Sequence, residues 1–300
     1  MGMGEKSIGN HGRVTLVGFG PGDPDLLTIK GYKSLEHADV IFYDDLTNES
    51  FLSQFEADKV YVGKRNGRHS HDQSEINELL YQSAALGNDV VRLKGGDPML
   101  FSHGREEVGF LRSRGVDVDI VPGVSSGNAL ASLLQIPLTH RGVARSVAMV
   151  LGHSDKLQTP DADTLLYYMG GSSISRIANS LIASGRNEDT PVAIVTHVSL
   201  PTQRAIYSTL EELRYAVFRD TPVLVMVGDV VRFVSESATQ VSYDMSIPVV
   251  IPDGLDKVDK VLFSSPAEVD TFTSLYGADI PKHLLLIAND NATYEKILSI

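Results

Sequence analysis

Short apolar runs alternate with amphipathic segments from residue 13 to residue 123. The apolar runs are rich in Val and Ile, and they predict strands over 13–18, 40–44, 59–63, 89–93 and 117–123. Apolar residues three and four positions apart predict helices over 25–38, 74–87 and 104–115. Strands that are apolar throughout are typical of a sheet that is covered on both faces. The alternation therefore predicts an α/β fold.

The same alternation continues in the second half of the chain. It predicts strands over 146–152, 164–170, 191–197 and 222–231, and helices over 172–185 and 208–217. We place a domain boundary near residue 137, which gives an N-terminal α/β domain over 13–137 and a C-terminal α/β domain over 138–244. Residues 1–12 are polar, and we expect them to be a disordered tail or a remnant of expression rather than part of the fold.

Residues 245–300 contain two further strand–turn–helix units. A segment this short buries too little apolar surface to be stable alone. We therefore expect a small βα appendage that packs on the main body or on a partner.

Composition narrows the function classes. The formal net charge of −12 disfavours general nucleic-acid binding, which depends on basic surface. The absence of cysteine excludes disulfides, thiolate catalysis and Cys-ligated metal sites, and it favours a cytoplasmic location. No apolar run approaches the roughly 18 residues of a membrane span, so we expect no membrane partner. The histidines have no zinc-binding spacing, so we expect no metal.

Two segments without any acidic residue are strongly basic on this acidic chain. They are "GKRNGRHSH" (63–71) and "LTHRGVARS" (138–146). Together they indicate a site for an anionic small molecule. The alternative is that each segment is a solvated surface loop.

Two glycine-rich turns follow predicted strands, "GFGPGD" (18–23) and "KGGDP" (94–98). In open α/β sheets, ligands bind beyond the carboxyl ends of the strands, and glycine lets the backbone approach them closely. In the first turn the third glycine comes one residue too early for a dinucleotide fingerprint, and Asp23 and Asp25 would repel phosphate. The two turns favour a polar, hydroxylated ligand without phosphate. Alternatively, they are ordinary turns, with Asp25 as a helix cap and Asp97-Pro98 as a rigid corner.

Three further residues end predicted strands. Asp44 is a candidate general base, although a cap for the next helix is the more ordinary interpretation. Lys64 could pair with a substrate carboxylate or transfer a proton, or it could be an ordinary surface lysine. For Met169, core packing is the ordinary interpretation of a methionine after an apolar run.

The ordered set of motifs is more specific than any one of them. "VTLVGFGPGDPDLLTIKG", "VVRLKGGDP", "VPGVSSG", "IPLTHR", "YYMGG" and "PVLVMVGDVV" span residues 14–231 and resemble the tetrapyrrole (corrin/porphyrin) methyltransferase family. Within it, "RLKGGDP" and "IPLTHR" are similar to the branch that methylates uroporphyrinogen III. The resemblance implies two α/β domains with the active site in the cleft between them, a fold different from the common Rossmann methyltransferase. It also implies a homodimer that uses S-adenosylmethionine and releases S-adenosylhomocysteine.

The resemblance also implies roles for particular residues. Asp44 corresponds to the family's proton acceptor and Lys64 to its proton donor. An anionic tetrapyrrole would be bound by the basic segments, at Arg65, Arg68, His69, His140 and Arg141. The cofactor-binding positions would be Pro21, Gly95, Gly96, Asp97, Leu100, Ser125, Ser126, Met169 and Val198. The implied reaction methylates uroporphyrinogen III at C2 and C7 to give precorrin-2, a precursor of sirohaem and cobalamin.

The chain departs from the family pattern at several positions. Asp45 stands where Arg is usual, Gly142 where Asp is usual, and Val198 where Gly is usual. A methyltransferase for a later corrin precursor and a catalytically decayed relative that only binds S-adenosylmethionine therefore stay as alternatives. In the appendage, "VLFSSPAEVDTF" (261–272) is similar to a short segment of uroporphyrinogen-III synthase. It is either a fusion remnant that serves as a packing module or an unrelated α/β addition.

Overall fold

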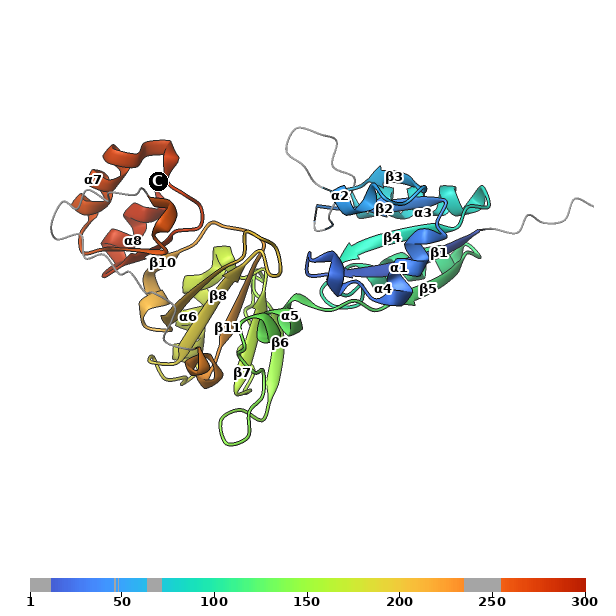
Figure 1. The fold of residues 1–300 in the computed structure, drawn as a ribbon. Coiled ribbons are helices and arrows are strands. Elements are labelled where there is room, and N and C mark those ends of the chain that lie inside the picture. Colours follow the sequence, from blue (N-terminus) through green and yellow to red (C-terminus); the bar gives the residue numbers. More distant parts are fainter. Residues whose placement is uncertain (1–11, 46, 48, 64–71, 235–254) are drawn as a thin grey trace, which may run out of the picture. The chain divides into compact units, whose positions relative to one another are not determined.

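A computed structural model describes residues 12–45, 47, 49–63, 72–234 and 255–300 (Figure 1). The chain separates into two compact units, residues 1–129 and 130–300. Each unit has its own sheet and its own apolar core. Among the described residues, no helix is long and apolar enough to cross a membrane.

The first unit contains one parallel sheet in the order β3-β2-β4-β1-β5. Its strands are β1 (Arg13–Gly20), β2 (Val40–Tyr43), β3 (Asp58–Tyr61), β4 (Val90–Gly95) and β5 (Asp117–Val121). All five predicted strands are confirmed. Because every strand runs in the same direction, the loops after β1, β4 and β5 leave the sheet at one edge.

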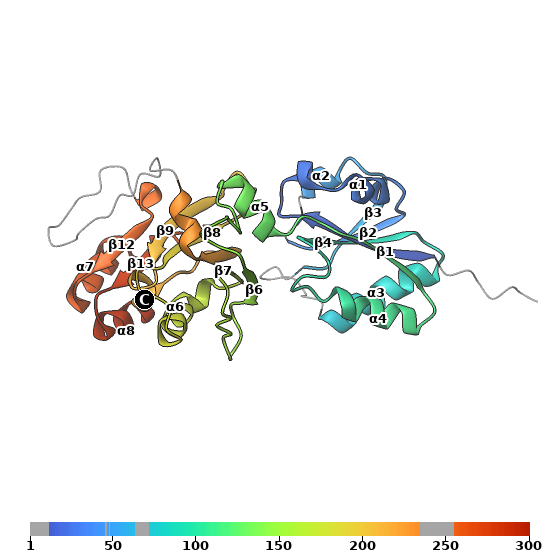
Figure 2. The same ribbon diagram turned by 90° about the horizontal axis from the view of Figure 1, so that it is seen from below.

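Helices cover both faces of this sheet. Figure 2 shows α1 (Ile29–Glu36) and α2 (Glu49–Leu52) on one face, and α3 (Gln73–Ala85) and α4 (Gly104–Ser113) on the other. The predicted helix over 25–38 is interrupted by a 3₁₀ turn over Pro24–Leu26. The Asp23 carboxylate accepts from the Asp25 N–H and caps this turn, so the expectation that Asp25 is the cap is wrong.

The second unit contains a mixed sheet in the order β6-β7-β11-β8-β9. Its strands are β6 (Val147–Leu151), β7 (Thr164–Tyr168), β8 (Pro191–Thr196), β9 (Arg204–Thr209) and β11 (Val223–Val227). The helix α6 (Ile174–Ala183) packs on the sheet as predicted. A further helix, α5 (Ser126–Leu133), begins in the first unit and ends in the second, and it was not predicted.

The predicted helix over 208–217 is wrong. That stretch is the end of β9, a 3₁₀ turn over Glu212–Tyr215 and the short strand β10 (Ala216–Val217). Leu210, Leu213 and Ala216 are three positions apart and all buried, which imitates one face of a helix. The alternating run "RAIYST" pairs along its whole length with β8, and this pairing decides the structure.

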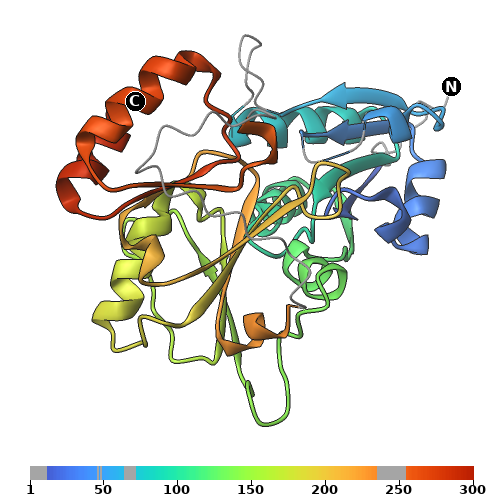
Figure 3. The ribbon, with the colours of Figure 1, turned by 60° about the vertical axis from the view of Figure 1, so that its left-hand side comes forward.

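The appendage packs on the second unit, which is one of the two arrangements that the sequence allowed. Strands β12 (Lys260–Phe263) and β13 (Leu285–Ala288) are parallel, and β10 adds to β13 in the antiparallel direction. Helices α7 (Pro266–Tyr276) and α8 (Asn291–Leu298) lie on one side of this small sheet (Figure 3). From the other side, Leu285 and Ile287 enter the core of the second unit.

Candidate functional site

The two glycine-rich turns of the first unit lie side by side. Gly96 N donates to Gly20 O at 2.7 Å, and Gly20 N donates to Gly96 O at 3.2 Å. A Cβ on Gly18 would lie 2.6 Å from the Gly96 oxygen, and a Cβ on Gly123 would lie 2.2 Å from it. Because no real Cβ tolerates such contacts, glycine is required where the loops after β1, β4 and β5 meet. The structure thus brings together the turns that the sequence singled out.

Asp97 joins two of these loops. Its Oδ1 accepts from Met99 N at 2.8 Å, and its Oδ2 accepts from Gly123 N at 3.1 Å. The residue before it, Gly96, has a φ of 66°, which is the left-handed region that glycine adopts without strain. Asp97 is therefore a structural corner, as the turn interpretation expected. A carboxylate has about four acceptor positions, so these two bonds leave capacity for a ligand donor.

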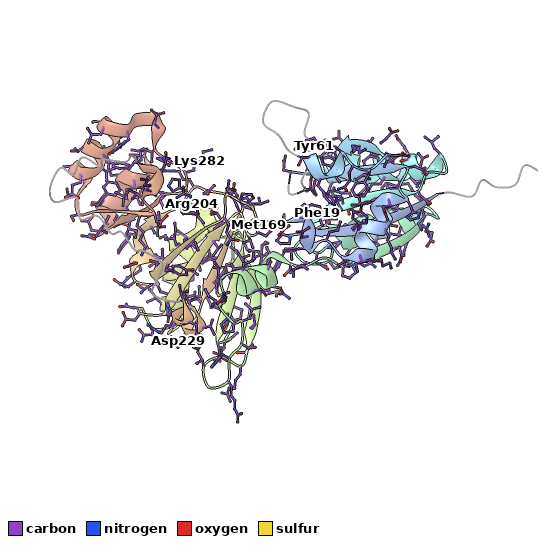
Figure 4. The ribbon with its side chains drawn as sticks, in the orientation of Figure 1. Phe19, Tyr61, Met169, Arg204, Asp229 and Lys282 are labelled. Carbon is purple, nitrogen blue, oxygen red and sulfur yellow. The ribbon has the colours of Figure 1, made fainter. Side chains whose placement is uncertain are left out.

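The other predicted cofactor residues of this unit lie along the same edge. Pro21 follows β1, Leu100 follows the Asp97 corner, and Ser125 precedes α5. All three are half-buried, as is Ser126 at the start of α5. The Ser125 carbonyl accepts from Asn128 N and Ala129 N and so begins that helix. Figure 4 labels Phe19 and Tyr61, which mark the same edge at the ends of β1 and β3.

Asp44 follows β2 and forms an ion pair. Its Oδ2 lies 3.1 Å from Arg92 Nη2, and its side chain is 24% exposed. Its carbonyl accepts from the Thr47 backbone N–H and from the Thr47 hydroxyl, which forms a tight turn after the strand. The neighbouring Asp45 accepts from the Tyr61 hydroxyl at 2.5 Å. The sequence pattern that predicted a chemically active Asp44 did not predict its ion pair with Arg92.

A buried group of charges lies behind Asp44. Glu107 of α4 is fully buried, and its Oε1 is 2.8 Å from Lys94 Nζ and 3.5 Å from Arg92 Nε. Burial lowers the pKa of Lys94, and the neighbouring Arg92 lowers it further, while Glu107 and Asp44 oppose the shift. The apolar pattern over 89–93 predicted a buried strand but not this group of charges. The available signal was Arg92 and Lys94, two positions apart and so on one face of a buried strand.

In the second unit, unusual backbone angles gather after β7 and β8. Met169 has a φ of 56° and a side chain that is 44% exposed. His197 and Ser199 have φ values of 51° and 68°. Such angles are strained for residues with a side chain and persist where the surroundings require them, often at ligand sites. Figure 4 shows Met169 and Arg204 at one edge of this sheet and Asp229 at the opposite edge.

The exposure of Met169 disfavours the core-packing interpretation. Val198, in contrast, is 6% exposed, so its side chain is buried. Next to it, the His197 ring lies 2.9 Å from the Thr221 carbonyl oxygen through Nε2. These residues follow two strands of one sheet, as the motif order predicted.

The basic segment over 138–146 forms a tight turn. His140 pairs with Ala144, and Gly142 has a φ of 85°, a left-handed angle that glycine adopts without strain. His140 and Arg141 are exposed, and the His140 ring lies 4.7 Å from the Phe233 ring. Lys64, Arg65, Arg68 and His69 lie outside the described residues. Within the described ranges, no group of three metal-ligating side chains is close enough to hold an ion.

Known proteins resemble most of this chain. A family model described as Tetrapyrrole (Corrin/Porphyrin) Methylases matches residues 13–214. A uroporphyrinogen-III C-methyltransferase of Methanocaldococcus jannaschii is 40% identical over 235 residues, which are 74% of this chain and 97% of the relative. A siroheme synthase of Psychrobacter cryohalolentis is 43% identical over 233 residues, 73% of this chain but 45% of the relative. The chain therefore spans about half the length of the siroheme synthases that it matches.

Solved structures show the same relation. A uroporphyrin-III C-methyltransferase from Thermus thermophilus, in complex with S-adenyl homocysteine, superposes with a TM-score of 0.64 at 43% identity. The match covers 74% of this chain and 99% of that one. A cobalt precorrin-4 methyltransferase superposes with a TM-score of 0.62 at 25% identity, over 73% of this chain and 95% of that one. The α/β fold predicted from the motifs is thus confirmed.

Proposed function

Because the chain belongs to the tetrapyrrole (corrin/porphyrin) methylase family, we propose that it is an S-adenosylmethionine-dependent C-methyltransferase that acts on uroporphyrinogen III. The observation that carries the proposal is the junction of Gly20 and Gly96 with Asp97 beside it. Bare backbone at a strand edge, together with a carboxylate, suits a ligand with a diol and an ammonium group. The Thermus thermophilus relative in complex with S-adenyl homocysteine supports this ligand class.

The chemistry needs alignment more than activation. The methyl group of a sulfonium is already electrophilic, so the protein has to hold it in line with a pyrrole carbon. A carbon–carbon bond forms as the sulfur–carbon bond breaks, which leaves S-adenosylhomocysteine and a cationic ring. Loss of a proton from the ring completes the step. Repetition at C2 and C7 gives precorrin-2, which serves sirohaem and cobalamin biosynthesis.

We assign the residues to three roles in this reaction. Asp44 takes the proton that the ring loses, and Lys64 occupies the position of the family's proton donor. The cofactor is held by the glycine junction, by the edge residues of the first unit and by Met169 and the backbone of Val198. The substrate's carboxylates are received by cationic side chains, for which forked guanidinium groups are the best partners. These are Arg65, Arg68, His69, His140 and Arg141.

The assembly and the compartment belong to the same proposal. We propose a homodimer, as the family pattern implies. A cytoplasmic location fits a chain without cysteine.

A second candidate is methylation of a later corrin precursor. It is favoured by the cobalt precorrin-4 methyltransferase, whose TM-score of 0.62 is nearly that of the Thermus thermophilus enzyme. The departures at Asp45 and Gly142 also favour it. The lower identity of 25% and the "RLKGGDP" motif favour the first candidate.

The test is an anaerobic incubation of the purified chain with S-adenosylmethionine and uroporphyrinogen III. We expect a dimethylated product by mass spectrometry and the absorption of an oxidised precorrin-2. The Asp44→Asn chain is the control, and we expect it to bind S-adenosylhomocysteine normally while it transfers methyl groups slowly. Binding without any methylation of uroporphyrinogen III by the unaltered chain would contradict the proposal.

A further inference from the structure

We infer that Arg92 is a positioning residue for this reaction, which fixes the Asp44 carboxylate and is itself held by the buried Glu107. The inference rests on the proposed function, because it assumes that Asp44 handles the proton. Arg92 lies in the middle of β4 and is not part of the glycine junction.

The guanidinium of Arg92 is fixed on three sides. Nη2 reaches Asp44 Oδ2 at 3.1 Å, and Nη1 donates to Leu93 O at 2.8 Å and to Phe42 O at 3.5 Å. On the third side, Nε faces Glu107 Oε1 at 3.5 Å. A planar group held by the backbone of two strands and by a carboxylate has no freedom to follow a moving partner. Arg92 therefore sets the position of Asp44, rather than the reverse.

Glu107 in turn is held by two further donors. Its Oε1 accepts from Lys94 Nζ at 2.8 Å and from Gln73 Nε2 at 3.1 Å. Gln73 also donates to Asn77 on the same helix, α3. The chain of contacts thus runs from α3 and α4 through β4 to the end of β2. Two cations and two carboxylates balance, so the group carries no net charge into the interior.

The exposure of the charged side chains increases from Glu107 to Asp44. Glu107 is fully buried and Arg92 is 5% exposed, whereas Asp44 is 24% exposed. The charges therefore begin inside the unit and reach solvent at the carboxyl edge of the sheet, beside Asp44. The strand that carries Arg92 and Lys94 continues directly into Gly95 and Gly96. One strand thus supports both the proton acceptor and the glycine junction.

Stability alone gives a weak reason for such a group. Apolar side chains of similar volume in place of a buried ion pair often leave a protein equally stable or more stable. The neighbours Val91 and Leu93, on the opposite face of β4, are ordinary core residues. Among the described residues, Glu107 Oε2 and Arg92 Nε have no hydrogen-bond partner, which apolar packing would avoid. A role in orienting Asp44 accounts for charges that packing does not require.

The experiment compares three variants with the unaltered chain. In Arg92→Gln the carboxylate of Asp44 loses its fixed partner, and we expect kcat to fall on the order of a hundredfold, the usual result of a misplaced reacting group. KM and the Kd for S-adenosylhomocysteine should change by less than about twofold, because the glycine junction remains. Arg92→Lys keeps one charged donor, and its kcat should lie between those of Arg92→Gln and the unaltered chain.

The double variant Arg92→Gln/Glu107→Gln separates positioning from stability. It removes one charge of each sign, so the buried group stays balanced and thermal unfolding should return toward that of the unaltered chain. We expect kcat to stay as low as in Arg92→Gln. Recovery of kcat together with stability would overturn the inference, as would an unchanged kcat in Arg92→Gln. If Arg92→Gln does not fold, Arg92→Lys and the double variant decide the matter in the same way.

Failure of the proposed function has a different signature. The unaltered chain would then bind S-adenosylhomocysteine but transfer no methyl group to uroporphyrinogen III, and this inference would fall with it. Failure of the inference alone would leave the unaltered chain active and Arg92→Gln equally active.

Discussion

The loops that follow β1, β4 and β5 in the first unit and those that follow β7 and β8 in the second are shaped in different ways. In the first unit the loops come together because side chains are missing at Gly18 and Gly123, where a Cβ would meet backbone atoms. In the second unit the edge is built from Met169, His197 and Ser199, which keep their side chains and adopt left-handed angles instead. The first edge depends on the room left by missing Cβ atoms, and the second on strained backbone angles. A substitution should therefore act through crowding in one unit and through backbone conformation in the other.

The largest effect is expected from crowding. In Gly123→Ala the new Cβ would lie 2.2 Å from the Gly96 oxygen, which is backbone and cannot move aside cheaply. We expect a loss of about 3 kcal/mol in the free energy of unfolding, the upper end for an added methyl group. Binding of S-adenosylhomocysteine should be lost at the same time. Denaturant unfolding and titration calorimetry measure both quantities.

Gly109→Ala in α4 is the matched control, because its Cβ would meet only the end of the Arg105 side chain at 3.5 Å. Alanine in a helix should raise the free energy of unfolding by up to about 1 kcal/mol. Equal stability of the two variants would refute crowding as the principle of the first edge.

The next effect concerns the corner that joins the loops. Asp97→Ala removes the acceptor for Met99 N and for Gly123 N. We expect the free energy of unfolding to fall by about 2 kcal/mol, since hydrogen bonds to charged groups are the stronger ones. Affinity for S-adenosylhomocysteine should fall at least about tenfold, because a ligand donor also loses its acceptor.

Asp290→Ala is the control for this corner. Asp290 caps α8 by accepting from Thr293 N at 2.7 Å, far along the chain from the glycine junction. We expect it to destabilise the appendage without any change in affinity for the cofactor product. A similar affinity in both variants would show that Asp97 is only a corner.

Strain relief should have a smaller effect, of the opposite sign. Met169→Gly frees a φ of 56° and should raise the free energy of unfolding by about 0.5–1 kcal/mol, which is the strain less the added freedom of the unfolded chain. The exposed side chain is lost, so S-adenosylhomocysteine should bind roughly fivefold more weakly.

Gln135→Gly provides the comparison, because Gln135 also has a φ of 56° but was never assigned to the site. It should be stabilised by a similar amount with unchanged affinity. If Met169→Gly destabilises the chain, the second edge is not held by strain.

The smallest effect concerns the junction of the second unit with its appendage. Burial raises the pKa of Glu212, but hydrogen bonds from Ser208 and Lys260 outweigh it, and the net pKa is lowered from 4.5. A lowered pKa in the folded chain contributes stability above pH 4.5, and that contribution is lost as the pH falls through the folded value.

Glu212→Gln should therefore be less stable than the unaltered chain near pH 6, and the two should converge as the pH falls below the lowered pKa of Glu212 in the folded chain. Denaturant unfolding followed by tyrosine fluorescence measures the difference, since the chain has no tryptophan. A difference that is independent of pH would contradict this assignment.

Regular elements were predictable where pattern and packing agree. All five strands of the first sheet follow from apolar runs, and so do the loops at their ends. The stretch over 208–217 was not predictable, because Leu210, Leu213 and Ala216 have helical spacing while the two ends of the stretch pair with β8 and β13. The glycine junction was predictable from two short motifs, whereas the contact between Arg92 and Glu107 joins residues that no local pattern connects.

One arrangement has a consequence for how the protein is made. The core of the second unit includes Leu285 and Ile287, and β10 pairs with β13. Synthesis on the ribosome delivers the chain from its N-terminus, so domains that are complete early can fold early. The first unit has all its strands by Val121. The second unit has the five strands of its main sheet by Val227, but part of its apolar core stays uncovered until residues 285–288 emerge from the ribosome.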